Sequence, residues 1–505
     1  MKVSAKITVI FGAFLLLAVW SSCDWLFSEV LDETLQDLNT IDNESFYVQN
    51  TTNRKFYKVK ADILAEGTKC IVYAERGSRV TNKTAQEMAS RYDTVIRPRV
   101  LAASKTDEDI LDYANRRTGG TDGRLTILLV DIKDGYKNKN DSYVAGYFYS
   151  GNFLARGPIK DSDNRILGYS NGADMIYIDT YPTLSDMTMI DKAYVTFAHE
   201  LQHLINFATY LKTNRSLPLD TWIDEGLASQ AEYLYLMDNP KDKCEWFVNE
   251  RIDTIPTGNN FFVWDNYKNK PLAILADYST VYLFFRWLYL QADAELQQSI
   301  YYDIASSLFS DYRAVTITAR QINSAWNSWE ILLRTWLAAN YDAKNSVYGY
   351  KNDPFLQNLI KIQPISGKNI SLYPGEGVYS TINNSFSFST TQPNIRYAGI
   401  TLNSGTVNTA SPVTGNMLLT FNANSNNKTS AETGSLTGYT AISNTEITAT
   451  RTALPSTHGE FGPYILDARD MLGRDQERAL VDNLLQLFHA EKAQLKRHVQ
   501  NEEPQ

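Results

Sequence analysis

The sequence predicts an α+β protein in which a β-rich part, a helical part and a second β-rich part follow one another along the chain. Runs of alternating apolar and polar residues, such as Phe56-Tyr57-Lys58-Val59-Lys60, predict strands in the first part. Between Leu219 and about Tyr341 the apolar residues recur at helical spacing. From about Pro364 to Thr450 the chain is rich in Ser, Thr, Asn and Gly with short apolar runs, which is typical of a β-sandwich-like domain.

The composition indicates a globular protein without a nucleic-acid partner. The 505 residues are 43% hydrophobic and 12% aromatic, which is enough to fill the cores of two or three domains. The formal net charge is −9 at pH 7, and no basic stripe interrupts the first 450 residues. Because phosphate backbones repel such a surface, we expect no binding to nucleic acid.

The first 22 residues have the pattern of an export signal. Lys2 and Lys6 precede an apolar run over residues 7–20, which is short for a membrane span. The small residues before Cys23 resemble the lipobox of bacterial lipoproteins, in which this cysteine is acylated; Trp20 departs from that pattern, since an aliphatic residue is usual there. We expect a lipoprotein of the bacterial cell envelope or surface, held in a lipid bilayer through acylated Cys23. Simple secretion and an uncleaved anchor are the alternatives.

A linker over residues 23–54 and a β-rich module over residues 55–120 are expected to follow. In this module Cys70-Ile71-Val72-Tyr73-Ala74 predicts a second strand, and Glu66-Gly67 predicts the turn before it. From about Thr84 to Ala103 the spacing becomes helical.

A central domain is expected over residues 121–350. Residues 125–130 and 175–179 predict buried strands, and the second of these ends before Tyr181-Pro182. The polar stretch over residues 131–141 contains several aspartates, but their spacing matches no calcium loop, and we expect a solvated loop.

The later segments complete the predicted organisation. Helices are predicted over residues 278–288 and 329–340, and Met417-Leu418-Leu419-Thr420-Phe421 predicts a strand in the β-sandwich-like domain over residues 351–455. A helical tail over residues 456–505 is amphipathic from Glu477 to His498. Three histidines of the tail lack ligand spacing, and we expect them to be surface residues: His458, His489 and His498.

Two cysteines remain besides Cys23. Cys70 and Cys244 could form a disulfide in an oxidising compartment, or each could be a small buried apolar residue. Neither has a nearby partner in a CxxC arrangement, which disfavours a cysteine zinc site.

The run Ala198-His199-Glu200-Leu201-Gln202-His203 is an HExxH zinc motif. Residues four apart on a helix lie about 40° from each other around its axis, so His199 and His203 can direct their imidazoles at one metal ion. Glu200 points about 100° away from His199 and can face a metal-bound water, which makes it the expected general base. The alternative is a surface glutamate beside two packed histidines.

A hydrolytic zinc site usually takes three protein ligands and leaves the fourth position to water. Glu225 is the expected third ligand, on a second amphipathic helix pattern over residues 221–234. Residues 204–224 are long enough for the first helix to end, a loop to turn, and this helix to return antiparallel.

The HExxH motif followed by Trp222-Ile223-Asp224-Glu225-Gly226-Leu227-Ala228-Ser229 resembles the gluzincin clan of metallopeptidases, and the wider setting looks most like the hyicolysin family of secreted bacterial peptidases. The resemblance covers about residues 55–345. It implies a thermolysin-like zincin catalytic domain, with a β-sheet upper part and a helical lower lobe. It also implies one catalytic Zn²⁺ held by His199, His203 and Glu225, with Glu200 as the catalytic residue.

A donor besides zinc usually stabilises the oxyanion of the tetrahedral stage. Related gluzincins place a tyrosine on a helix after the glutamate ligand, and this resemblance points to Tyr278, with Tyr282 and Arg286 as alternatives and a packing role for Tyr278 also open. Glu232 follows Glu225 by seven residues on the same helix face, where it can accept a hydrogen bond from a ligand histidine or face the solvent.

Together these features predict an extracytoplasmic zinc endopeptidase acting on polypeptide substrates. The strand at residues 175–179 is expected to form the upper wall of the cleft and to pair with extended substrate. A zinc aminopeptidase is the nearest alternative, but Gly172-Ala173-Asp174-Met175-Ile176 lacks the glutamate and asparagine of the Gly-x-Met-Glu-Asn strand that binds a free amine there. A surface-binding lipoprotein with an inactive or secondary zinc site is the second alternative, and retention of Glu200 argues against it. No oligomeric state follows from the sequence.

Overall fold

The structure is a computed structural model that describes Leu38 and most of residues 42–435. Within that range it leaves out 106–108, 138–142, 162, 186–188, 214, 250–261, 263–273, 343, 360–363, 365–368, 383–384, 389–391, 402–405 and 426–431. The predicted signal peptide, Cys23, the helical tail and its three histidines lie outside the described residues.

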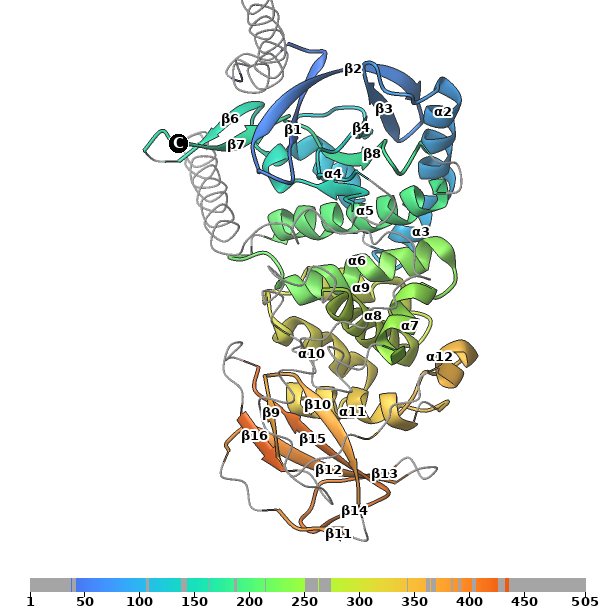
Figure 1. The fold of residues 1–505 in the computed structure, drawn as a ribbon, viewed down its shortest axis with the longest axis vertical. Coiled ribbons are helices and arrows are strands. Elements are labelled where there is room, and N and C mark those ends of the chain that lie inside the picture. Colours follow the sequence, from blue (N-terminus) through green and yellow to red (C-terminus); the bar gives the residue numbers. More distant parts are fainter. Residues whose placement is uncertain are drawn as a thin grey trace, which may run out of the picture.

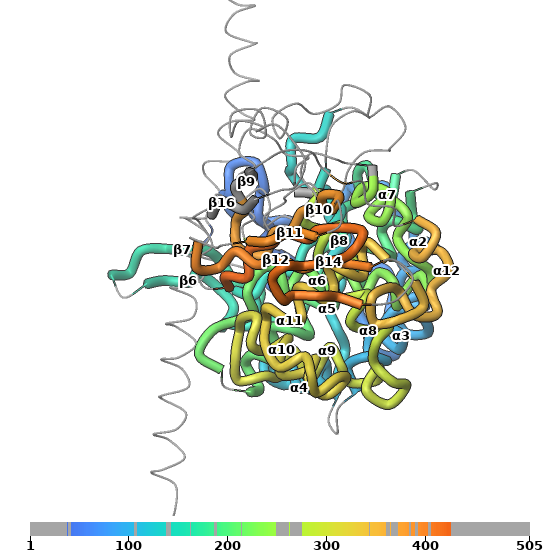
Figure 2. The backbone as a smooth tube through the Cα atoms, turned by 90° about the horizontal axis from the view of Figure 1, so that it is seen from below, coloured from blue at the N-terminus to red at the C-terminus, as the bar shows by residue number. Residues whose placement is uncertain are grey.

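Three layers follow one another along the long axis of the molecule (Figure 1). A β-sheet with its flanking helices forms one end, helices form the middle, and a second β-region forms the other end. Seen from that second end, the strands of the last layer lie in front of the helices (Figure 2). The architecture is therefore mixed α+β, as the sequence predicts.

The first layer is a six-stranded sheet in which the neighbouring strands β3, β4 and β8 are parallel. The outer strands β1, β2 and β5 are each antiparallel to the strands with which they pair. In spatial order its strands are β1 (Ser45–Gln49), β2 (Phe56–Glu66), β3 (Cys70–Glu75), β4 (Leu125–Val130), β8 (Met175–Asp179) and β5 (Gly146–Phe148). The strands predicted at 56–60, 70–74, 125–130 and 175–179 are confirmed. The sheet joins strands from both sides of residue 121, and β1 lies within the segment predicted as a linker; the domain boundaries stay a prediction.

The position of β8 corrects one expectation. This strand pairs with β4 on one side and with β5 on the other, so its hydrogen bonds are used within the sheet and it cannot pair with substrate. The edge strand on this side of the sheet is β5, a strand of three residues that the sequence did not predict.

Helices connect and cover the sheet. The crossover from β3 to β4 contains α2 (Asn82–Arg91), α3 (Arg97–Leu101) and α4 (Ile110–Arg117), and it confirms the helical spacing seen from Thr84. A hairpin of β6 (Gly157–Lys160) and β7 (Ile166–Ser170) projects from the side of this layer (Figure 1).

Helix α5 (Ile190–Thr213) lies between the sheet and the remaining helices. The middle layer below it contains α6 (Thr221–Leu236), α7 (Lys241–Asn249), α8 (Ile274–Gln291), α9 (Ile300–Ala305), α10 (Tyr312–Ile322), α11 (Trp329–Asp342) and α12 (Pro354–Leu359). The helices predicted over 278–288 and 329–340 are confirmed by α8 and α11. No helix within the described ranges has both the length and the apolar character needed to cross a lipid bilayer.

The last layer contains a four-stranded antiparallel sheet and two strand pairs. The four-stranded sheet has the order β10 (Gly377–Thr381), β15 (Met417–Asn422), β12 (Ile395–Thr401) and β13 (Thr406–Asn408), and the pairs are β11 (Ser385–Phe386) with β14 (Val413–Thr414) and β9 (Asn369–Leu372) with β16 (Glu432–Ser435).

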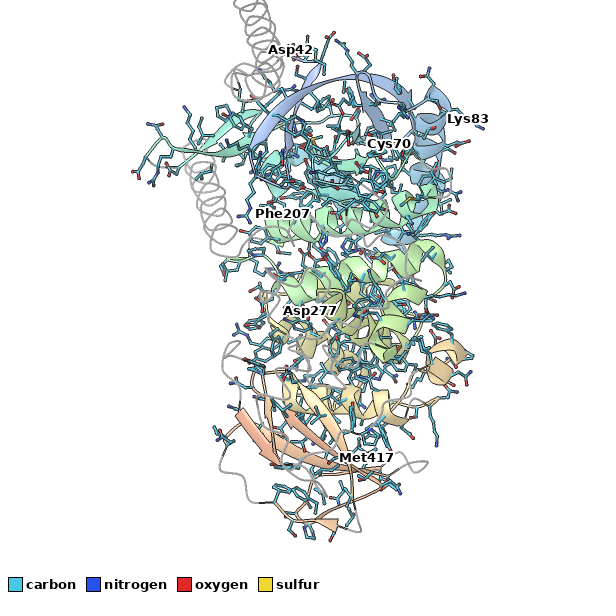
Figure 3. All side chains as sticks on the ribbon, viewed as in Figure 1. Asp42, Cys70, Lys83, Phe207, Asp277 and Met417 are labelled. Carbon is cyan, nitrogen blue, oxygen red and sulfur yellow. The ribbon has the colours of Figure 1, made fainter. Side chains whose placement is uncertain are left out.

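Both faces of the four-stranded sheet are buried. Neighbouring residues of a strand point to opposite faces, so one strand contributes to two apolar cores. Tyr379 and Leu419 belong to the apolar core of the helices, whereas their neighbours Val378 and Leu418 belong to a separate core within the last layer. Met417 also packs into the helical core (Figure 3). The last layer is thus fused to the helices through a shared core.

The two cysteines are free and buried, and they lie in different apolar cores. Cys70 packs in the sheet layer (Figure 3), whereas Cys244 on α7 packs among the helices. Each is therefore a small apolar core residue, and the disulfide is excluded in this structure.

Close packing of α6 on α8 depends on Gly226. A Cβ atom at this position would lie 2.2 Å from Cδ2 and 2.3 Å from Cε2 of Phe285, a buried ring on α8. That ring is itself confined by Trp222, at 5.7 Å between ring centroids, and by Phe284, at 5.2 Å. Glycine therefore sets the distance between the two helices next to Glu225.

We predict that Gly226→Ala destabilises the protein. Forcing a methyl group against Phe285 costs about 1–3 kcal/mol of overpacking, which exceeds the gain of about 0.5–1 kcal/mol that alanine brings to a helix interior. Denaturant unfolding should show a loss of about 1–2 kcal/mol. Thr221→Ala, at an exposed position of the same helix, is the control and should change stability by less than about 0.5 kcal/mol. Equal stability of Gly226→Ala and wild type would contradict this packing constraint.

Candidate metal centre

The candidate site lies where α5 passes over α6. His199, Glu200 and His203 project from the middle of α5, and all three are buried. Each of them offers one ligand atom, and these three atoms all lie within 4.8 Å of one another. Such a group can hold a metal ion. The helical period therefore brings the two imidazoles and the carboxylate to one place, as the sequence predicts.

Glu225 on α6 lies against both histidines. Its Oε2 atom is 3.2 Å from His199 Nε2 and 3.3 Å from His203 Nε2. A single carboxylate oxygen thus closes a triangle with two imidazole nitrogens across the interface between α5 and α6. The antiparallel return of α6 after α5 makes this contact possible.

Glu200 is held by the edge strand of the sheet. The Phe148 backbone N–H donates a hydrogen bond of 2.9 Å to Glu200 Oε2. Asp179 N donates to Ala145 O, so strand alternation turns the backbone groups of Ala145 and Tyr147 toward β8 and those of Gly146 and Phe148 away from it. The free edge of β5 therefore faces α5 at Glu200.

Gly146 allows β5 to approach α5 and β8 this closely. A Cβ atom there would lie 2.7 Å from the Tyr177 carbonyl oxygen and 3.1 Å from Thr196 Cγ2. Gly146 is next to Thr196 and Phe148 is next to Glu200, so β5 runs in the same direction as α5. An extended peptide on this edge would pass directly over Glu200.

Each histidine also contacts a second carboxylate through Nδ1. His199 Nδ1 lies 2.7 Å from Glu232 Oε1, and His203 Nδ1 lies 3.2 Å from Asp224 Oδ1. The predicted contact between Glu232 and a histidine is confirmed, and Glu232 is buried rather than facing the solvent. An ionised carboxylate can only accept, so with a metal at Nε2 the neutral imidazole of His199 would carry its proton on Nδ1 and donate it to Glu232.

The buried charges shift two pKa values in opposite directions. Burial favours the neutral imidazole of His199, yet hydrogen bonds to Glu225 and Glu232 raise its pKa to about 9 in the metal-free protein. Burial also opposes ionisation of Glu232, but the charge of Lys243 and the contact with His199 outweigh it and hold the pKa of Glu232 below its usual value.

Among the three predicted oxyanion donors, Tyr278 is the one that lies beside the histidines. Its ring centroid is 6.1 Å from that of His199, and its side chain is buried at the start of α8. The Tyr282 hydroxyl instead donates a hydrogen bond of 2.7 Å to Asn239 Oδ1. Arg286 pairs with Asp353 at 3.0 Å and stacks on the Tyr233 ring at 3.5 Å. Tyr282 and Arg286 therefore belong to the packing between the helices.

Sequence reasoning missed four residues around the site: Phe148, Asp224, Asn206 and Lys243. Asp224 directly precedes Glu225, and Asn206 follows His203 by three residues, so helical spacing from the motif residues was the available signal. Asn206 Nδ2 donates a hydrogen bond of 2.7 Å to Asp224 Oδ1. Phe148 and Lys243 reach the site only through the tertiary fold.

No family model matches the chain. A curated relative that the chain matches is a neutral metalloprotease of Staphylococcus hyicus, ShpI, with 27% identity over 266 residues. The match covers 52% of this chain and 54% of the relative, so the chain spans about half the length of that protein. Taken with the His-Glu-His cluster, this similarity supports a place for the chain within the metallopeptidases and implies a metal cofactor.

Proposed function

We propose that this protein is an extracytoplasmic zinc endopeptidase of the hyicolysin type, with a thermolysin-like catalytic domain. The observation that carries the proposal is the contact of one Glu225 oxygen with both imidazole Nε2 atoms, at 3.2 and 3.3 Å. Ligand atoms that surround a zinc ion tetrahedrally at 2.0–2.1 Å are about 3.3–3.4 Å apart. The two distances from Glu225 Oε2 to the imidazole nitrogens match this spacing, which supports His199, His203 and Glu225 as the residues that would hold a zinc ion.

A zinc ion at this position would acidify a bound water and polarise the scissile carbonyl. The Glu200 carboxylate would serve as the general base that takes up a proton from the attacking water, and as the general acid that gives it to the leaving amine. The Phe148 N–H holds the Glu200 carboxylate in place for both transfers. Tyr278 donates a hydrogen bond to the carbonyl oxygen as negative charge develops there.

The substrate backbone adds to the outer edge of β5 at Gly146, beside the Phe148 N–H that is bonded to Glu200, in place of the strand β8 that the sequence indicated. Backbone hydrogen bonds of this kind are independent of side chains and favour extended polypeptide as the substrate class. Among the described residues near this edge, Ala145-Gly146-Tyr147-Phe148 contains no carboxylate, and Asp174 at the start of β8 is buried with Asn115 and Thr118. The lack of an anchor for a free amine in this described part of the chain favours internal cleavage over aminopeptidase activity.

The cellular location rests on the sequence. The lipobox-like residues before Cys23 support a lipoprotein of the bacterial cell envelope or surface, anchored in the bilayer by acylation of this cysteine. Export directed by this signal would bring the enzyme into contact with extracytoplasmic polypeptides.

We predict that Glu200→Gln abolishes peptidase activity and leaves the metal bound. The amide keeps the shape of the side chain but cannot take up the proton, so kcat/KM should fall by about 10²–10⁴-fold. The assay uses a peptide blocked at both ends and metal analysis of the same samples, with the exposed Glu87→Gln as control. Cleavage of this peptide at the wild-type rate by Glu200→Gln would reject the mechanism, and failure of the wild type to cleave it would reject the endopeptidase.

We predict that zinc binding becomes stronger as the pH rises from 7 to about 8.5. The metal-free protein holds a proton on His199 up to a pKa of about 9, and zinc must displace this proton. One displaced proton strengthens the apparent affinity by about tenfold per pH unit below that pKa. Competition against a chromophoric chelator, corrected for protonation of the chelator, measures this slope. A flat profile above pH 7 would show that His199 is already neutral.

We predict that Tyr278→Phe lowers kcat by about 10–10³-fold with little change in KM, because the lost hydroxyl acts on the oxyanion and not on the bound substrate. Tyr282→Phe is the matched control one turn along α8, where the hydroxyl bonds Asn239. It should retain activity and lose about 1 kcal/mol of stability. Equal activity of Tyr278→Phe and wild type would assign Tyr278 to packing.

A further inference from the structure

Lys243 reaches from α7 back onto α6 and contacts Glu232. After α6 ends at Leu236 the chain turns through Met237, which has the left-handed φ of 55°, and α7 begins at Lys241. This turn allows Lys243 to reach Glu232 on α6. The ammonium group donates to Glu232 Oε1 and, at 3.3 Å, to Ser229 Oγ, and it lies 5.4 Å from the centre of the Tyr278 ring.

The same carboxylate oxygen serves Lys243 and His199. Glu232 Oε1 is the atom that lies 2.7 Å from His199 Nδ1, so the lysine and the imidazole converge on one acceptor. A donor on the far side of that oxygen restricts the rotamer of Glu232. The direction of the His199 ring is thereby fixed, because the carboxylate holds its Nδ1.

The second histidine has a parallel arrangement with a neutral donor. Asp224 Oδ1 lies 3.2 Å from His203 Nδ1 and accepts a hydrogen bond of 2.7 Å from Asn206 Nδ2. The Oδ1 atom of Asn206 in turn accepts a hydrogen bond of 2.9 Å from Gln202 Nε2. Each imidazole is therefore backed by a carboxylate, and each carboxylate is backed by a further donor. The donor is an amide on the His203 side and a cation on the His199 side.

A cation is required on one side because the centre gathers negative charge. Glu200, Glu225, Glu232 and Asp224 surround the two imidazoles, and a divalent ion balances only two of the four carboxylates. The Lys243 side chain is only 15% exposed, so its own desolvation must be offset by contact with a carboxylate. Its position against Glu232 meets both needs.

We propose that Lys243 is a positioning residue of the metal centre, acting through Glu232 to fix the ring of His199. The inference rests on the proposed metal function of the site. Because the lysine touches neither metal nor substrate, its removal should act on metal binding and coordination geometry. By the usual effect of residues behind a metal ligand, Lys243→Met should weaken zinc binding about 10–100-fold.

The test compares Lys243→Met with Lys241→Met, an exposed lysine on the same helix, and with Lys243→Arg as the conservative variant. Zinc affinity is measured by chelator competition, and the ligand field is followed by the visible absorption of the Co²⁺-substituted protein. We expect Lys243→Met to lose affinity and to change the Co²⁺ spectrum, Lys241→Met to match the wild type, and Lys243→Arg to recover most of the affinity. Thermal unfolding of the metal-free proteins shows whether Lys243→Met is folded.

A double-mutant cycle with Glu232→Gln separates this role from a simple link between α7 and α6. If Lys243 acts through Glu232, Lys243→Met should change zinc affinity by less than about twofold in the Glu232→Gln background, because the effects are not additive along one chain of contacts. Wild-type affinity and spectrum in Lys243→Met, or full additivity in the double variant, would overturn the inference. Absence of zinc binding by the wild type would instead reject the proposed function itself.

Discussion

The separation of α5 and α6 is the constraint on which the rest of the structure depends. Three atoms from these helices, two imidazole nitrogens and one carboxylate oxygen, must meet within about one bond length of a common point. Gly226 and Trp222 set the distance between α6 and α8. Gly146 sets the distance between β5 and α5. Small residues stand where helices or strands must approach, and large aromatic rings fill the space behind them.

The sequence predicts the parts of this site that follow from local periodicity. His199, Glu200 and His203 are defined by spacing on one helix, and Glu225 follows from the length of chain needed for an antiparallel return. The strands at 70–74 and 175–179 are long enough to show their pattern. Glu232 was correctly placed on the face of α6 that carries Glu225, because helical spacing determines that face.

The remaining features depend on long-range packing and have no local signal. The three residues of β5 are too few to show alternation. Substrate pairing was expected at β8 because no local pattern shows that β5, an earlier segment of the chain, pairs with the outer side of β8. Lys243 is one of two lysines in α7, with no local feature that distinguishes it from Lys241, and only the turn after α6 brings it to Glu232. Arg286 was an alternative to Tyr278 as the oxyanion donor, but it pairs with Asp353, which lies far along the chain.

The aromatic core has a consequence for how this protein loses its structure. Trp222, three residues before Glu225, packs on Phe284, which packs on Trp336, and the next residue, Leu337, accepts a hydrogen bond from Tyr379 in the last β-layer. One chain of packed residues thus runs from α6 to a strand that lies 157 residues further along the sequence. Heat or denaturant that melts the distal sheet strips the support from α6, so the described layers should unfold as one cooperative unit instead of shedding a dispensable module.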